Sequence, residues 1–145
     1  MTWPTPVPGL VIPYSYLWQS EATAGREEIV KDRPCAIVLV VHQDEGIEPL
    51  VAVLPITNAA PQNNDAVEIP AALKSHLGLD VQRSWVVVSE GNLFRWPGPD
   101  LRPAISGDVT SIVFGTVPPR FFKSIRDKFL SNMRMRQTDV VRRTE

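Results

Sequence analysis

The sequence predicts a mainly β domain that ends in one α-helix. Fourteen prolines and eight glycines are spread over the 145 residues. This composition argues against a helical bundle, because proline removes a backbone donor and breaks helix interiors. Short apolar runs rich in β-branched and aromatic residues lie between turn-forming segments, which is typical of strands. Helical periodicity is strong only after Pro118-Pro119.

Each strand is predicted from a short apolar run bounded by turn residues. The predicted strands are residues 10–12, 35–41, 50–54, 67–69 and 85–88, and residues 111–115 add an edge strand. The polar segment 42–46 contains a glycine and is interpreted as the hairpin connection between the second and third strands. Residues 91–103 hold three prolines and two glycines and are predicted to form a long loop, a kind of segment that is often functional.

Two helical segments follow from proline positions and apolar spacing. Pro70 is placed to start one helical turn over residues 70–74, because proline is favoured at the first helical position. After Pro118-Pro119, apolar residues recur at i, i+3 and i+7 with charges on the other face. This pattern predicts an amphipathic helix that packs on the sheet. Its apolar positions are Phe122, Ile125 and Phe129.

Length and composition predict a single domain over residues 1–145, with its core at about residues 9–130. A chain of this length can bury roughly two-thirds of its unfolded surface. No signal peptide is recognisable, and the longest apolar run, residues 35–41, is too short to cross a bilayer. The lone cysteine, Cys35, fits a reducing compartment. We therefore expect a soluble cytoplasmic protein with no membrane contact, and a ragged tail over residues 131–145 where the helical pattern is lost.

Charge is unevenly distributed although the formal net charge is only −1. From Arg120 onward eight basic residues stand against three acidic ones, whereas residues 1–119 hold seven basic and thirteen acidic residues. Nucleic-acid binders usually present a basic face, so this balance counts against RNA binding by the body alone. The basic tail is interpreted as a solvated helix end.

Several classes of active site are absent from the sequence. The glycines form no GxGxxG or GxxxxGK phosphate-binding motif, and no GxSxG elbow occurs. His42 and His76 are thirty-four residues apart without an HExxH motif, so a histidine-based zinc site is not expected. We expect neither a metal nor another cofactor.

An ordered set of short motifs remains, and each falls where a predicted strand begins or ends. Gly9 precedes the first strand, Arg33-Pro34 precedes the second, and Pro55-Ile56-Thr57 follows the third. This order resembles the PemK/MazF toxin family, in which a glycine, an "RP" dipeptide and a "P-I-T" triplet occupy these places. The resemblance continues through Val67-Glu68-Ile69-Pro70, Gly78-Leu79, Ser84-Trp85-Val86-Val87, Glu90 and Gly115.

The resemblance implies an SH3-like β-barrel that acts as a metal-free endoribonuclease of a type II toxin-antitoxin system. Such a growth inhibitor cleaves single-stranded messenger RNA, forms a homodimer and is neutralised by a cognate antitoxin. The resemblance places the catalytic pair at Arg33 and Thr57. Dimer contacts are expected to cover an apolar patch beside Phe121 or Phe122.

Substrate contacts are expected from four further residues. Glu90 aligns with an acid of the family, and Asn92 stands where many members carry a basic residue. Arg95 and Trp96 lie in the predicted loop, where a guanidinium plane and an aromatic face can stack on bases. Residues 21–30 form a longer and more acidic segment before "RP" than the family pattern implies.

The chemistry of metal-free RNA cleavage agrees with the catalytic pair. The ribose 2′-hydroxyl attacks the phosphate, so the protein must orient that phosphate and stabilise a doubly charged phosphorane. Arg33 offers a planar, permanently charged fork that matches two phosphate oxygens. Thr57 offers a hydroxyl that can hold a phosphate oxygen or the 2′-hydroxyl. Because a guanidinium does not lose its proton in proteins, charge stabilisation suits Arg33 better than proton transfer.

Structural interpretations stand beside these functional ones. Arg33 can pair with a nearby carboxylate, Thr57 can be an ordinary turn hydroxyl, and Trp96 can cover the barrel. The alternative functions are an inactive toxin homologue and a non-catalytic SH3-like binding module with a groove lined by Phe94 and Trp96. The carboxylates near Arg33 in the sequence are Glu27, Glu28 and Asp32.

Overall fold

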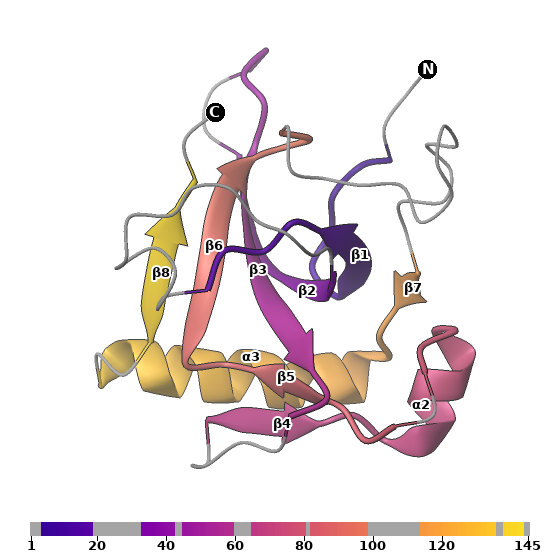
Figure 1. Cartoon of the computed structure of the whole chain (residues 1–145). Helices are drawn as coiled ribbons and strands as arrows, with labels where there is room; N and C mark the ends of the chain where they lie inside the picture. Colours follow the sequence, from indigo (N-terminus) through magenta and orange to yellow (C-terminus); the bar gives the residue numbers. More distant parts are fainter. Residues whose placement is uncertain are drawn as a thin grey trace.

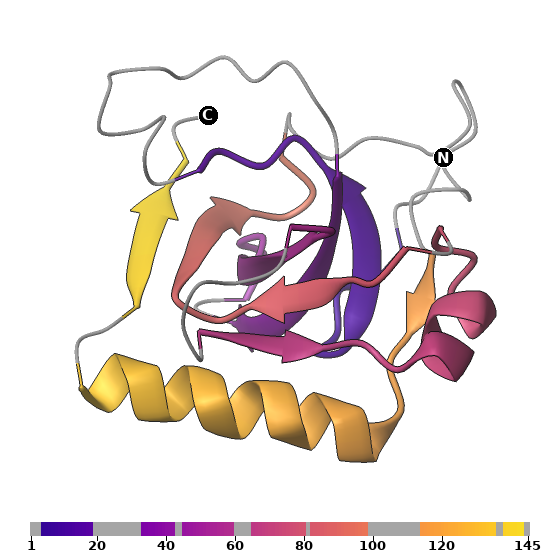
Figure 2. The same cartoon turned by 60° about the horizontal axis from the view of Figure 1, so that its bottom comes forward.

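The computed structural model describes residues 4–18, 33–42, 45–59, 65–80, 82–98, 114–135 and 138–143. Within these ranges eight strands form a curled sheet, and a long helix lies along one side of it (Figure 1, Figure 2). The strands are β1 (Leu10–Tyr14), β2 (Arg33–Val41), β3 (Leu50–Thr57), β4 (Ala66–Glu68), β5 (Trp85–Val87), β6 (Glu90–Arg95), β7 (Gly115–Thr116) and β8 (Asp139–Arg142). The helices are α2 (Ala71–His76) and α3 (Pro119–Arg134).

The sheet follows the order β4-β5-β3-β2-β1-β7, with β6 paired to β3 and β8 paired to β6. Neighbouring strands are antiparallel except for β6 and β8, which are parallel. The predicted mainly β fold with a C-terminal helix is confirmed. β2 and β3 pair across the predicted hairpin connection, of which residues 43 and 44 lie outside the described ranges. The same is true of residues 111–113 in the predicted edge strand, and β7 begins at Gly115.

The central strands are buried on both faces, because successive side chains of a strand point to opposite sides. One apolar cluster takes Val11, Ala36 and Leu54 from the sheet and Ile125 and Phe129 from α3. A second cluster forms on the other face of the same strands. Its aromatic members are Tyr14, Tyr16, Phe94 and Trp96.

Helix α3 packs on the sheet as its apolar spacing predicts (Figure 2). Pro119 lies in the first turn, where a missing N–H breaks no helical hydrogen bond. Ile125 and Phe129 are buried, and Phe121 and Phe122 are half-buried against the first cluster. Phe121 and Phe122 thus keep part of their surface exposed, and the dimer patch expected beside them stays a prediction. No helix in the described ranges is long and apolar enough to cross a membrane.

Gly9 fixes the position of β1, as its place in the motif series predicts. Its φ of +94° lies in a region that favours glycine. Its N–H donates to the Ile37 carbonyl oxygen at 2.8 Å, and its own carbonyl oxygen accepts from the N–H of Val117 at 2.9 Å. The turn therefore joins β1 to β2 on one side and to the segment before α3 on the other.

Strand β6 corrects the prediction of a loop over residues 91–103. Gly91 and Asn92 are weak strand formers, yet both lie in β6 and are buried. A Cβ at Gly91 would lie 3.0 Å from the Val53 carbonyl oxygen, so glycine lets β6 approach β3 closely without crowding. Tertiary packing rather than local propensity sets this strand. Residues 99–103 lie outside the described ranges.

Strand β8 corrects the prediction of a ragged tail over residues 131–145. After α3 the chain returns to the sheet and pairs with β6 in parallel, from Glu90↔Asp139 to Leu93↔Arg142. Arg143 follows the strand and is 6% exposed. Its Nη1 donates to the Ser15 carbonyl oxygen at 2.7 Å. Residues 138–143 are thus part of the fold, and this arginine of the basic tail is internal rather than solvated.

Candidate active site

A cleft opens where β3 leaves β2. The ladder between the two strands ends at Cys35↔Pro55, because Pro34 and Pro55 have no N–H to extend it. Beyond this point β3 pairs with β5 instead. The resulting Arg33 cleft has a volume of about 220 Å³ and is lined by Arg33, Pro34, Ile56, Asn58, Leu79, Asp80 and Ser84.

Arg33 brings a positive charge to this cleft. Its guanidinium carbon lies 4.8 Å from the centroid of the Trp18 ring, a contact that orients the guanidinium without neutralising it. Its Nε is buried without a hydrogen-bond partner, and no carboxylate among the described residues forms an ion pair with it. The acidic residues near it in the sequence lie outside the described ranges. An anionic ligand would satisfy such a group.

Thr57, the predicted catalytic partner of Arg33, is half-buried at the end of β3. Its Oγ1 accepts a hydrogen bond from the N–H of Ala59 at 3.1 Å, so the hydroxyl supports the turn after the strand. The neighbours Ile56 and Asn58 line the Arg33 cleft, consistent with the alternation of side chains along a strand. The structure therefore brings the predicted segment to Arg33, with Asn58 as its polar side chain in the cleft. The catalytic role of Thr57 stays a prediction.

A hydrogen-bond chain that the sequence did not reveal holds Asn58. Its Nδ2 donates to Oδ2 of Asp80 at 2.9 Å, and its Oδ1 accepts from Oγ of Ser84 at 2.6 Å. Oδ1 of Asp80 lies 2.7 Å from Nζ of Lys74, which is 4% exposed. The hydrogen bond from Lys74, and then the one from Asn58, hold the pKa of Asp80 below its usual range. The chain therefore fixes the amide of Asn58 with an ionised carboxylate at neutral pH.

Glu90 connects to Arg33 indirectly. Its Oε1 accepts a hydrogen bond from the Tyr16 hydroxyl at 2.9 Å, and the Tyr16 ring meets the Trp18 ring edge-on at 5.1 Å. Burial, and then the charge of Glu90, raise the pKa of Tyr16 above its usual value. Because Trp18 in turn contacts Arg33, Glu90 helps to position this arginine through Tyr16 and Trp18. It does not line the Arg33 cleft, and its predicted contact with substrate stays a prediction.

Asn92 has a structural position, which corrects its expected contact with substrate. It is 0% exposed. Its Oδ1 accepts from the N–H of Leu17 and its Nδ2 donates to the carbonyl oxygen of Leu17, both at 2.8 Å. The side chain thus pairs with the backbone as a neighbouring strand would, and it ties residues 15–18 to β6.

We expect Asn92→Leu to destabilise the protein strongly. The change keeps the size of the side chain but leaves the N–H and the carbonyl of Leu17 buried without partners. Each unsatisfied group costs about 1–3 kcal/mol, so the free energy of unfolding should fall by about 2–5 kcal/mol. Urea unfolding measures this difference. An unchanged urea midpoint would show that water replaces the amide and that Asn92 is not the tie described above.

Arg95 and Trp96 lie at the far end of the sheet from Arg33. Arg95 pairs with Leu50, at the opposite end of β3 from Thr57, which is roughly 20 Å away at ~3.3 Å per residue. Its Nη1 donates to the Glu48 carbonyl oxygen at 2.8 Å. Trp96 is 5% exposed, and its Nε1 donates to the Pro4 carbonyl oxygen at 3.0 Å. Both residues therefore lie away from Arg33, and their expected contact with substrate stays a prediction.

The same burial removes the predicted peptide groove. Phe94 and Trp96 were expected to line it, but Phe94 is 2% exposed and stacks on Tyr14 at 4.6 Å between ring centroids. Both aromatic side chains belong to the second core cluster. The binding-module alternative therefore loses the surface on which it was based.

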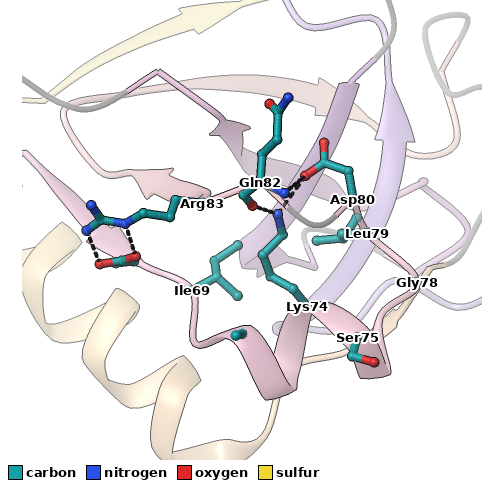
Figure 3. A pocket seen from close by; sticks show the side chains of 10 residues that line it. Ile69, Lys74, Ser75, Gly78, Leu79, Asp80, Gln82 and Arg83 are labelled. Atoms are coloured by element: carbon teal, nitrogen blue, oxygen red, sulfur yellow. Dashed lines mark hydrogen bonds and ion pairs between the residues drawn. The ribbon is translucent and has the colours of Figure 1, made fainter.

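A second and larger cleft adjoins the first. This α2 cleft has a volume of about 360 Å³ and shares Leu79 and Asp80 with the Arg33 cleft. Figure 3 shows Lys74 and Asp80 meeting the backbone of Gln82 on one side of it and Arg83 pointing to the other, with Ile69 between them. Its remaining lining residues are Glu68, Ala71, Ser75 and Gly78.

The part of the chain that the structure describes holds no group of three or more His, Cys, Asp or Glu side chains arranged to bind a metal ion. His42 and His76 are both exposed. The chain matches no protein-family model, and the comparison with curated proteins gives no match. The likeness to PemK/MazF toxins therefore depends on the motifs quoted above.

Proposed function

We propose that the protein is a toxin-type endoribonuclease that cleaves single-stranded RNA through attack by the ribose 2′-hydroxyl. The proposal rests on the environment of Arg33. Its charge is not neutralised by any described carboxylate, its Nε is buried without a partner, and it lines an open cleft. These are the properties of a phosphate-binding arginine.

Arg33 binds the scissile phosphate and stabilises the charge that develops on its oxygens. Its contact with Trp18 limits the orientations of the guanidinium, so less freedom is lost when the phosphate binds. Asn58 faces the same cleft, and its amide nitrogen carries two hydrogens, of which Asp80 takes one. The second hydrogen is the neutral donor that this mechanism requires near a phosphate oxygen.

Cleavage is expected to persist in EDTA and to leave a 2′,3′-cyclic phosphate or a 3′-phosphate. Both follow from attack by the neighbouring 2′-hydroxyl, with the charge stabilised by Arg33 rather than by a cation. The test incubates a long RNA with the purified protein in EDTA and identifies the fragment ends by mass spectrometry. Fragments that end in a 3′-hydroxyl and a 5′-phosphate, or activity that returns only with magnesium, would contradict the mechanism.

The expected homodimer, cognate antitoxin and cytoplasmic location remain proposals. Leu39, Val41 and Ile47 on and beside the β2–β3 hairpin are 47%, 38% and 48% exposed, and exposed apolar groups of this size often lie in interfaces. We expect the protein to sediment as a dimer at micromolar concentration and Leu39→Lys to weaken that dimer. A monomer at the highest soluble concentration would contradict the expectation.

A further inference from the structure

The α2 cleft adjoins the proposed phosphate site. Leu79 and Asp80 line both clefts, so a ligand bound at Arg33 lies next to the α2 cleft. In RNA the group next to a phosphate along the chain is a nucleoside.

Charges in the α2 cleft cancel in pairs. Lys74 lies 2.7 Å from Asp80, and Arg83 binds Glu68 through two hydrogen bonds of 2.7 and 2.8 Å. Arg33, by contrast, forms no ion pair with the described residues. An anion therefore suits the Arg33 cleft, and a neutral polar ligand suits the α2 cleft. In RNA a phosphate is the anion, and the base next to it is the neutral polar group.

The walls of the α2 cleft offer what a base needs. Ile69 is buried and Leu79 half-buried, so both give apolar contact. The Arg83 guanidinium lies 5.1 Å from the Trp85 ring and its side chain is 72% exposed, and guanidinium planes stack on bases.

Asp80 adds an acceptor for the base edge. Its carboxylate accepts three hydrogen bonds, from Nζ of Lys74, Nδ2 of Asn58 and the N–H of Gln82. An ionised carboxylate has about four lone-pair sites, so one remains for the exocyclic amino group of a base.

We propose that the α2 cleft is a nucleobase subsite, which receives the base adjoining the phosphate held by Arg33 and favours a base with an exocyclic amino group. The subsite rests on the proposed function, because it is defined by its position beside that phosphate. Adenine, cytosine and guanine carry the amino group, and uracil does not. The subsite would therefore give the enzyme selectivity for sequence.

The test measures binding of an RNA tetranucleotide with fluorine in place of every 2′-hydroxyl, which the proposed mechanism cannot cleave. Each base is removed in turn to give four abasic probes. Removal of one particular base should weaken binding to the wild-type protein roughly tenfold or more, and uracil at that position should bind more weakly than cytosine. Ala71→Trp and Ala72→Trp form a matched pair, since both alanines are exposed in α2 and only Ala71 lines the cleft.

Ala71→Trp should bind the intact and abasic probes alike, whereas Ala72→Trp should behave as the wild type. Equal binding of all abasic probes by the wild type, or equal losses in the two variants, would overturn the subsite. Absence of any binding would overturn both the subsite and the phosphate site. Base-dependent binding that Ala71→Trp removes, without cleavage of natural RNA, would leave the subsite standing and refute the nuclease.

Discussion

Arg33→Ala is expected to abolish RNA cleavage while the protein remains folded. An arginine that stabilises a transferring phosphate typically contributes on the order of 10³-fold or more to the rate. Arg33→Lys should restore little activity, because an ammonium cannot bind two phosphate oxygens as a planar fork does. Stability should change little, since Arg33 lies half-buried at the first position of β2 and forms no ion pair with the described residues. The measurement compares initial cleavage rates and melting temperatures of the three proteins.

Arg126→Ala is the matched control for the loss of one positive charge. Arg126 lies on α3 and is half-exposed, beside Asp127 at 3.3 Å. This variant should cleave RNA as the wild type does. Full activity in Arg33→Ala would end the nuclease assignment. Equal losses of activity in both arginine variants would show that Arg33 acts only through general electrostatic attraction of the RNA. A lowered melting temperature with activity retained would support the structural interpretation of Arg33.

Elements with strong local patterns are the ones that the sequence predicts well. The apolar runs that become β2 and β3 are rich in valine, leucine and isoleucine. This composition alone predicts buried strands. Helix α3 is predicted by its apolar spacing, because Ile125 and Phe129 fall on its core-facing side and are buried there. In these segments local propensity and tertiary environment agree.

Strands β6 and β8 were missed because their partners, not their residues, make them strands. Gly91 and Asn92 disfavour extended structure locally, but Gly91 permits close approach to Val53 and Asn92 holds the backbone of Leu17. β8 pairs with β6 across about fifty residues of sequence. The local sequence of either segment does not predict these long-range contacts.

The candidate site divides in the same way. The motif "RP" correctly predicts Arg33 at the start of a strand, and "PIT" correctly predicts the end of the strand that faces it. Asn58, Asp80 and Lys74 were not predicted, because a hydrogen-bond chain among three separate segments leaves no local pattern. For Trp96 the sequence allowed both stacking on a base and covering the barrel, and the structure favours the second, since the residue is 5% exposed.

Asn58→Ala is expected to lower the cleavage rate by on the order of 10²-fold, the typical cost of one preorganised donor to a developing oxyanion. Thr57→Val should lower the cleavage rate by less than about tenfold if its hydroxyl only supports the turn. That hydroxyl accepts an exposed hydrogen bond from Ala59, and such a bond contributes about 1 kcal/mol to stability. Ser84→Ala keeps the amide of Asn58 but removes the hydroxyl that orients it, so its rate should fall between those two.

Rates for these three variants are compared on one RNA substrate, with urea unfolding as the measure of stability. The order of the losses decides which side chain serves the phosphate. If Thr57→Val loses on the order of 10²-fold and Asn58→Ala does not, the threonine hydroxyl is the donor, as the family resemblance implies, and Asn58 only supports the turn. If Asn58→Ala loses activity with its stability unchanged, the donor is the amide that Asp80 and Ser84 hold in the cleft. Lys74 then supports catalysis indirectly, because its ion pair holds the Asp80 carboxylate in place.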